Sequence, residues 1–160
     1  MTLILLIKDD EISRIYLSEA LAGPFTTVIA CENFAYGIAF SNGTTFDLIV
    51  SDIQLGDGSL FEKFANLPAD IPVIATSADL NAGTRSLLKQ IGIDNQLVKP
   101  ASVEEIQNAV KRALPPAAHT DQSPLWIETH AHKAIGNLAS ASKTYSNPNF
   151  RLWQSRSSMH

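Results

Sequence analysis

The sequence contains a single cysteine, Cys31, among its 160 residues. One cysteine can form neither an intramolecular disulfide nor a multi-cysteine metal site, so both kinds of scaffold are excluded. Basic residues are also scarce: 12 Lys and Arg stand against 16 Asp and Glu, giving a net charge of −4. This balance argues against a strongly basic nucleic-acid binder. Long apolar runs are absent near the N-terminus, where residues 3–7 are followed at once by Lys8. That run is too short for a membrane span or a secretory signal, so we expect a cytoplasmic protein without membrane contact.

Charge and composition divide the chain into an acidic domain and a basic end. Residues 1–114 hold 8 Lys and Arg against 14 Asp and Glu, whereas residues 115–160 hold 4 against 2. The change falls at a stretch that begins Pro-Pro-Ala-Ala and shows no apolar period, which is typical of a linker. We therefore expect a domain over residues 1–114, a linker over 115–124 and a short C-terminal extension over 125–160.

Within the domain, short apolar runs alternate with segments of helical periodicity. The pattern predicts strands at residues 3–7, 26–31, 46–51, 71–76 and 96–98. It predicts helices at residues 11–21, 34–40, 59–67, 80–91 and 103–114. The strands are continuously apolar, which indicates burial on both faces and hence a parallel sheet covered by helices on each side. We expect a doubly wound α/β fold with five strands and five helices.

Polar residues follow these strands at the edge where their carboxyl ends meet. They are Asp9, Asp10, Asp52, Thr76, Ser77 and Lys99. Any one of them could be polar only because strand ends meet solvent, but the set as a whole favours a site, since ligands bind at this edge of such sheets. Carboxylates hold Mg²⁺ through oxygen, and a lysine neutralises phosphoryl oxygens. The set therefore suits phosphoryl transfer to a carboxylate.

Four segments in this order resemble the receiver domain of two-component response regulators over roughly residues 2–114. They read LLIKDDE at 5–11, DLIVSD at 47–52, PVIATSA at 72–78 and LVKP at 97–100. The resemblance implies a flavodoxin-like sheet with strand order 2-1-3-4-5, and a signalling domain rather than an enzyme in the usual sense. It also implies phosphoryl transfer from a histidine kinase or a histidine phosphotransfer protein.

The resemblance assigns a role to each matching residue. Asp52 is similar to the phospho-accepting aspartate, Lys99 to the family's lysine, and Ser77, not Thr76, to the switch hydroxyl because Ala78 follows it. The peptide bond before Pro100 is expected to be cis. For Mg²⁺ the resemblance implies the ligands Asp9, Asp52 and the backbone carbonyl of Gln54, with Asp10 as a further candidate.

Two departures from the family pattern bear on function. Lys8 stands where a first acid is usual, and Gln96 where an aromatic residue usually swings between two positions. Lys8 allows two interpretations. It points out of the site, leaving the metal to Asp9 and Asp10, or it lies beside Asp52 and replaces the cation. The resemblance implies Mg²⁺ as the cofactor, and we expect Lys8 to weaken its binding.

Three functional hypotheses follow. The first is a stand-alone receiver phosphorylated on Asp52 that signals by contact with a downstream protein. The second is a pseudo-receiver, an interaction module that works without phosphorylation, which Lys8 and Gln96 favour. The third, a phosphohydrolase similar to the haloacid-dehalogenase family, is disfavoured because Gln54 stands where that family has a second aspartate.

The C-terminal extension is too short for the DNA-binding domains that usually follow a receiver. Its sequence predicts one helix that starts near Ser123 and carries Ile127, Ile135 and Leu138 on one face, followed by disordered chain. The alternative is an extension that is mostly disordered.

Overall fold

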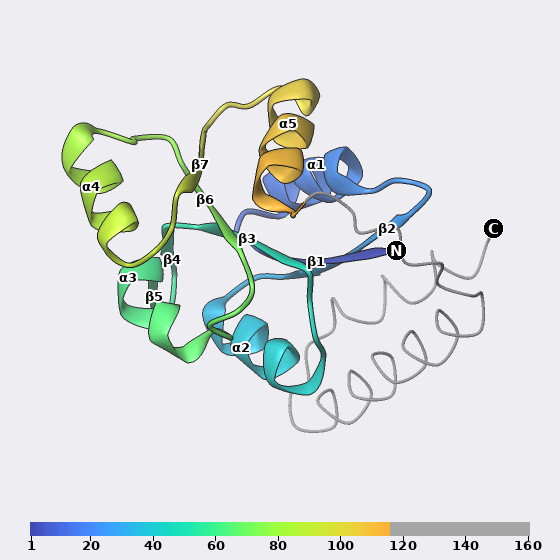
Figure 1. Cartoon of the computed structure of the whole chain (residues 1–160), viewed down its shortest axis with the longest axis horizontal. Helices are drawn as coiled ribbons and strands as arrows, with labels where there is room; N and C mark the ends of the chain where they lie inside the picture. The colour runs from blue at the N-terminus through green and yellow to red at the C-terminus, as the bar shows by residue number, and fades with distance from the viewer. Residues whose placement is uncertain (116–160) are drawn as a thin grey trace. The chain divides into compact units, whose positions relative to one another are not determined.

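The computed structural model describes residues 1–115 of the chain, and these form a parallel sheet covered by helices (Figure 1). The sheet contains β1 (Thr2–Ile7), β2 (Thr26–Cys31), β3 (Leu48–Asp52), β6 (Val73–Ser77) and β7 (Asn95–Val98). Their order is β2-β1-β3-β6-β7, and every neighbouring pair is parallel. This is the expected 2-1-3-4-5 order. The expected linker and extension lie outside the described residues, apart from Pro115.

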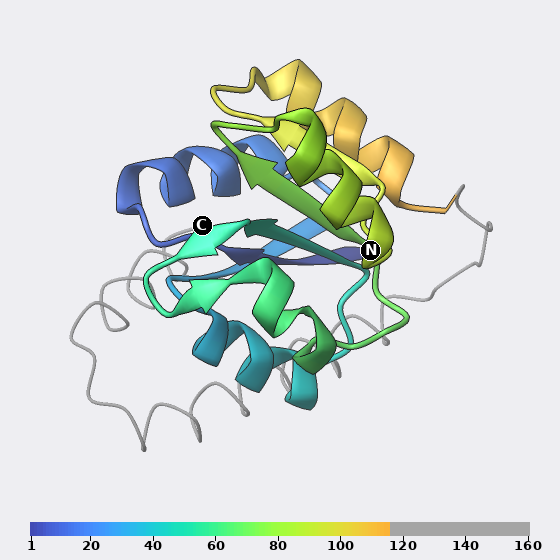
Figure 2. The same ribbon diagram turned by 90° about the vertical axis from the view of Figure 1, so that its left-hand side faces the viewer.

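Helices cover both faces of the sheet. They are α1 (Glu11–Leu21), α2 (Phe34–Gly43), α3 (Leu60–Lys63), α4 (Ala82–Gln90) and α5 (Val103–Ala113), with a 3₁₀ turn at Phe64–Asn66. Figure 2 shows α1 and α5 on one side of the sheet and α2 and α3 on the other. No helix within residues 1–115 is long and apolar enough to cross a membrane.

Each helix begins at a residue whose side chain accepts a hydrogen bond from a backbone N–H of the first turn, which satisfies one of the donors that a helix start leaves unpaired. These caps are Asp10, Asn33, Ser59, Asn81 and Ser102. At Ser59 and Ser102 a glutamate three residues on returns a bond to the cap backbone, completing a capping box. The caps set where the helices begin, and so fix the lengths of the loops at the carboxyl edge of the sheet.

One small element was not expected from the sequence. After β3 the chain forms a two-stranded antiparallel hairpin from β4 (Gln54–Leu55) and β5 (Gly58–Ser59). Asp57, at its tip, accepts hydrogen bonds from the backbone N–H groups of Phe34 (3.1 Å) and Ala35 (3.0 Å) at the start of α2. The hairpin therefore ties the loop that follows Asp52 to a helix on one face of the sheet.

Candidate functional site

The polar side chains expected at the carboxyl edge of the sheet meet around Asp52. Asp52 is the last residue of β3, Lys8 follows β1, and Lys99 follows β7. Both Asp52 and Lys8 are almost completely buried, with 3% and 4% of their surface exposed. Buried charges need partners, so their contacts decide what this site can do.

Three donors supplied by the protein bind the Asp52 carboxylate. The Nζ atom of Lys8 lies 2.5 Å from Oδ2, and Nζ of Lys99 lies 3.0 Å from both carboxylate oxygens. The hydroxyl of Thr76 donates to Oδ1. Both oxygens of Asp52 thus accept hydrogen bonds, and three of these bonds come from the two lysines. Charge-assisted bonds of this kind are stronger than bonds between neutral groups.

The alternation of side chains along parallel strands explains why Lys8 points inward. Residues two apart on a strand share a face, and the core that contains α1 and α5 includes Leu6, Val50 and Ile74. Lys8, Asp52 and Thr76 each stand two residues after one of these. The backbone holds Lys8 in this line, because its N–H donates to the carbonyl of Cys31 at 2.9 Å. The pleat of the sheet therefore places the side chains of Lys8, Asp52 and Thr76 on the same face of the sheet, the face covered by α1 and α5.

The surroundings of Lys8 keep it charged. Burial alone would lower the pKa of Lys8, but the hydrogen bond to Asp52 and the negative charge of Asp52 outweigh burial and raise the pKa above its ordinary value. Asp9 adds to this effect, with Oδ1 3.6 Å from Nζ of Lys8. Lys8 therefore carries its positive charge at neutral pH.

The model of the response regulator receiver domain matches residues 4–111 of this chain, more than half of its length. The chain belongs to the response regulator receiver family. Receiver domains are the signalling domains of two-component phosphorelays and are not conventional enzymes, as expected from the four sequence segments.

Known receivers show the same relationship. The chain is 30% identical over 116 residues to the KDP operon transcriptional regulatory protein KdpE of Escherichia coli, covering 71% of this chain and 52% of KdpE. It therefore spans about half the length of KdpE. Among solved structures, the chemotaxis regulator CheY4 of Vibrio cholerae superposes with a TM-score of 0.65 at 21% identity, over 71% of this chain and 99% of CheY4. The likeness to CheY4 shows that the two chains share a fold.

Receivers of this fold bind magnesium, as the receiver domain of sensor histidine kinase PA1611 from Pseudomonas aeruginosa illustrates. Its structure holds a magnesium ion in the active-site cleft, and it resembles this chain with a TM-score of 0.63 at 20% identity, over 70% of this chain and 96% of that domain. The likeness raises the question whether the residues around Asp52 suit the same ion.

The residues of this receiver do not fit a magnesium ion at Asp52. Mg²⁺ needs oxygen ligands in a strict octahedral arrangement, yet Lys8 and Lys99 already bind both carboxylate oxygens. Asp9 is half exposed and faces Lys8. Asp10 accepts a hydrogen bond from the backbone N–H of Ser13 at 2.8 Å as the cap of α1. Lys8 therefore does not point out of the site. It lies beside Asp52, as in the second interpretation, in which its ammonium group replaces the cation.

The expected metal ligand at Gln54 stands at the first position of the hairpin that follows Asp52. Its side-chain Nε2 donates to the carbonyl of Gly58 at 3.3 Å. The role of its backbone carbonyl as a ligand stays a prediction.

The two hydroxyls at the end of β6, those of Thr76 and Ser77, differ in their contacts. Thr76 pairs directly with Asp52 across the β3–β6 register and donates to its carboxylate. The Ser77 hydroxyl instead donates to the carbonyl of Asp79 at 3.1 Å. The match of Ser77 to the switch hydroxyl stays a prediction, and Thr76 is the group that sequence reasoning did not assign to Asp52. Strand register is the signal that finds it, because the two residues are direct neighbours.

The remaining expectations concern β7 and the loop that follows it. The peptide bond between Lys99 and Pro100 is cis, as expected from the resemblance. Gln96 lies on β7 away from Asp52, where its Oε1 accepts a hydrogen bond from Nη1 of Arg85 at 3.0 Å. An amide hydrogen-bonded to Arg85 therefore stands where the family usually has a mobile aromatic ring.

Proposed function

We propose that this receiver is a pseudo-receiver, which takes part in two-component signalling by protein contact without phosphorylation of Asp52. The observation that carries the proposal is the buried Lys8–Asp52 pair, with 2.5 Å between Nζ and Oδ2. Attack on phosphorus needs a free carboxylate oxygen and cations around the phosphoryl group. Here the ammonium group of Lys8 is bound to Oδ2 of the acceptor, and it must leave before a phosphoryl group can enter.

A second candidate function is phosphorylation of Asp52 by a histidine kinase or a histidine phosphotransfer protein. The contacts of Lys99 with both oxygens of Asp52 favour it, because the same lysine would neutralise phosphoryl oxygens. Asp9 also remains beside the site. This candidate requires Lys8 to swing out, and it keeps the expected kinase partner, downstream protein target and cytoplasmic location that are typical of receivers.

Treatment with acetyl phosphate and Mg²⁺, followed by intact mass measurement, separates the two candidates. We expect the parent chain to gain no phosphoryl group, because Lys8 occupies the acceptor. Lys8→Asp removes the ammonium and restores an acid for the metal, so this variant should gain one phosphoryl group. In Lys8→Asp/Asp52→Asn the gain should disappear, which locates it at Asp52.

Lys8→Met provides a matched control, since it removes the cation without supplying an acid. Labelling of Lys8→Met should stay well below that of Lys8→Asp. Labelling of the parent chain to the same extent as Lys8→Asp would reject the pseudo-receiver and establish the second candidate.

A further inference from the structure

One edge of the sheet is formed by β2, which pairs with β1 and with no other strand in residues 1–115 (Figure 1). The carbonyl of Phe25, directly before β2, accepts a hydrogen bond from the N–H of Thr2 at 2.7 Å. The carbonyl of Cys31, at the end of β2, accepts one from the N–H of Lys8 at 2.9 Å. Because the backbone groups of successive residues point to opposite sides of a strand, the odd-numbered residues of β2 face β1.

The even-numbered residues of β2 turn their backbone groups to its open side. They are Thr26, Val28 and Ala30. The N–H of Thr26 donates to the carbonyl of Gly23 at 3.1 Å in the preceding turn. The N–H and C=O groups of Val28 and Ala30 have no hydrogen-bond partner among the described residues, and Ala30 is exposed. An edge of this kind is a template for pairing with another strand.

The segment that builds this edge carries almost no charge. Residues 20–46 contain a single charged residue, Glu32, whereas residues 1–114 contain 8 basic and 14 acidic residues. The segment includes β2 and α2, and α2 itself has no charged residue. The rings of Tyr36 and Phe40 stack on α2 with 6.4 Å between their centroids. Depletion of charge and enrichment of aromatic rings are typical of the centre of a protein interface.

The uncharged helix α2 packs closely against the strands at this edge. A Cβ atom at Gly37 would stand 2.5 Å from Cδ1 of Ile7 on β1 and 3.6 Å from Sγ of Cys31 on β2. Glycine at this position therefore lets the helix approach both strands. Ala35 and Ala39 are exposed on the same helix. The open side of β2 is thus flanked by a surface of small and aromatic side chains.

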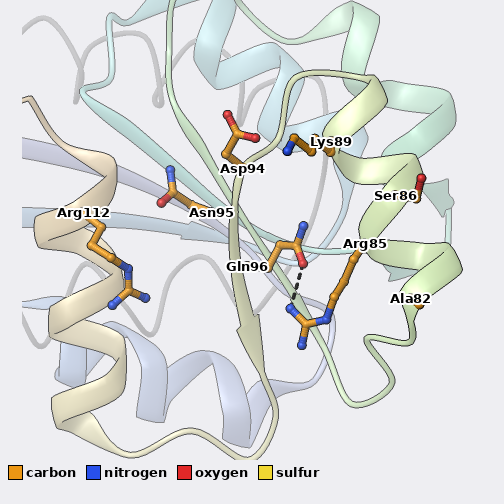
Figure 3. Close-up of a pocket in the computed structure, with 8 residues that line it drawn as sticks. All are labelled: Ala82, Arg85, Ser86, Lys89, Asp94, Asn95, Gln96 and Arg112. Atoms are coloured by element: carbon orange, nitrogen blue, oxygen red, sulfur yellow. Dashed lines mark hydrogen bonds between the residues drawn. The ribbon is translucent and has the colours of Figure 1, made fainter.

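The opposite edge of the sheet, β7, is protected by charge. Arg85 and Lys89 from α4, Arg112 from α5 and Asp94 line a cavity of about 620 Å³ beside β7 (Figure 3). Charged side chains at an edge strand are a common protection against pairing with another chain, as is proline. The strand β2 contains neither a charged residue nor a proline. The two edges of the same sheet therefore differ in how well they suit strand pairing.

We propose that β2 pairs antiparallel with β2 of a second copy of this chain, so that the two sheets join across a two-fold axis. Antiparallel pairing of identical edges is self-complementary, because each copy offers the other the same donors and acceptors. With the axis at Val28, its N–H donates to the carbonyl of Val28 in the second copy, and the N–H of Ala30 donates to the carbonyl of Thr26. By symmetry each of these bonds forms twice.

Charge favours a second copy as the occupant of this edge. An acidic domain repels its own copy wherever the facing surfaces are charged, so an uncharged sector is the part through which two copies can approach. The pairing also places only uncharged side chains opposite one another, Val28 against Val28 and Thr26 against Ala30. This inference goes beyond the proposed function and does not depend on whether Asp52 is phosphorylated.

Sedimentation equilibrium of the full chain tests the pairing, and we expect a reversible dimer. Ala30→Pro removes the N–H that donates across the axis, so it should weaken dimerisation by about thirtyfold. An edge strand tolerates proline where the N–H faces solvent, so the domain should still fold. Ala82→Pro, the matched control, makes the same substitution at the first residue of α4, which accepts proline, and should leave the dissociation constant unchanged. Ala30→Thr keeps the N–H and should stay within about twofold of the parent.

Amide hydrogen exchange of the parent chain, followed by NMR, locates the contact without any variant. The N–H groups of Val28 and Ala30 should be protected at concentrations where the dimer forms and should exchange freely on dilution. The N–H of Ile29 faces β1 and should be protected at both concentrations. A chain that stays monomeric at millimolar concentration would overturn the proposal. Equally fast exchange of Val28 and Ala30 in the dimer and the monomer would overturn it as well, and a dimer disrupted by Lys89→Glu but not by Ala30→Pro would place the contact at β7 instead.

Discussion

Asp52→Ala is expected to lower the free energy of unfolding by about 3 kcal/mol. The substitution leaves the ammonium group of Lys8 buried, with 4% of its surface exposed, without its principal partner. Removing one member of a buried pair is far more costly than removing both, because an unpaired charge remains. Asp9, at 3.6 Å from Lys8, relieves part of this cost. Urea denaturation at pH 7 measures the loss.

A double-mutant cycle identifies the cause. Lys8→Met/Asp52→Ala removes both charges and should recover most of the stability lost in Asp52→Ala, giving a coupling energy of about 2 kcal/mol. Asp70→Ala removes an exposed carboxylate and should stay within about 0.5 kcal/mol of the parent. A loss below about 1 kcal/mol in Asp52→Ala would mean that Lys8 is not held by Asp52.

The pH dependence of the same measurement follows from the raised pKa of Lys8. A lysine whose pKa is higher in the folded state contributes stability that is complete below its unfolded pKa and is lost as the pH rises through the folded value. The unfolded pKa is near 10.5, the ordinary value of a lysine. In Asp52→Ala the principal group that raises the pKa of Lys8 is gone and burial lowers it, so the difference between the parent chain and Asp52→Ala should be largest at pH 7 and should shrink as the pH rises toward and beyond 10.5.

Lys8→Asp is expected to tighten Mg²⁺ binding by about a hundredfold. The substitution changes the charge beside Asp52 by two units and removes the Lys8 ammonium group from Oδ2 of Asp52, which then keeps only its contact with Lys99. Coulomb attraction for a divalent ion some 5 Å away in a water-like medium gives about 3 kcal/mol, which corresponds to that factor. Isothermal titration calorimetry compares the two dissociation constants.

Lys8→Met again serves as the control for the Mg²⁺ titration. It removes the positive charge without adding a negative one, so about half of the gain in free energy is expected, or roughly tenfold in affinity. Asp70→Ala, far along the chain from Asp52, should leave the dissociation constant unchanged. Equal constants for the parent and Lys8→Asp would show that Lys8 does not compete with the metal.

The fold could be predicted from the sequence because its strands are continuous apolar runs with helical segments between them. Boundaries were less accurate where caps decide them: the helix expected from residue 80 begins after Asn81, whose side chain caps α4. The hairpin β4–β5 was missed because strands of two residues have no periodicity. The apolar pattern of the sequence predicts whether a segment is a helix or a strand. The residues at which a helix or strand begins and ends depend on individual hydrogen bonds.

The site could be predicted in part. Strand ends located Asp52 and Lys99 at one edge, and the structure brings them together. The orientation of Lys8 remained open, because a strand buried on both faces does not reveal which residues share a face with Asp52. The contact of Thr76 with Asp52 depends on the register of β3 against β6, which no local pattern encodes. Asp10 was a further candidate metal ligand, and the structure shows its side chain as the cap of α1, so its role as a ligand stays a prediction.

A crystal structure of the parent chain grown at neutral pH with millimolar Mg²⁺ tests the central claim most directly. The account predicts that Nζ of Lys8 stays within hydrogen-bond distance of Asp52 and that no metal stands between Asp9 and Asp52. A magnesium ion bound by Asp9, Asp52 and the carbonyl of Gln54, with Lys8 turned out to solvent, would contradict it.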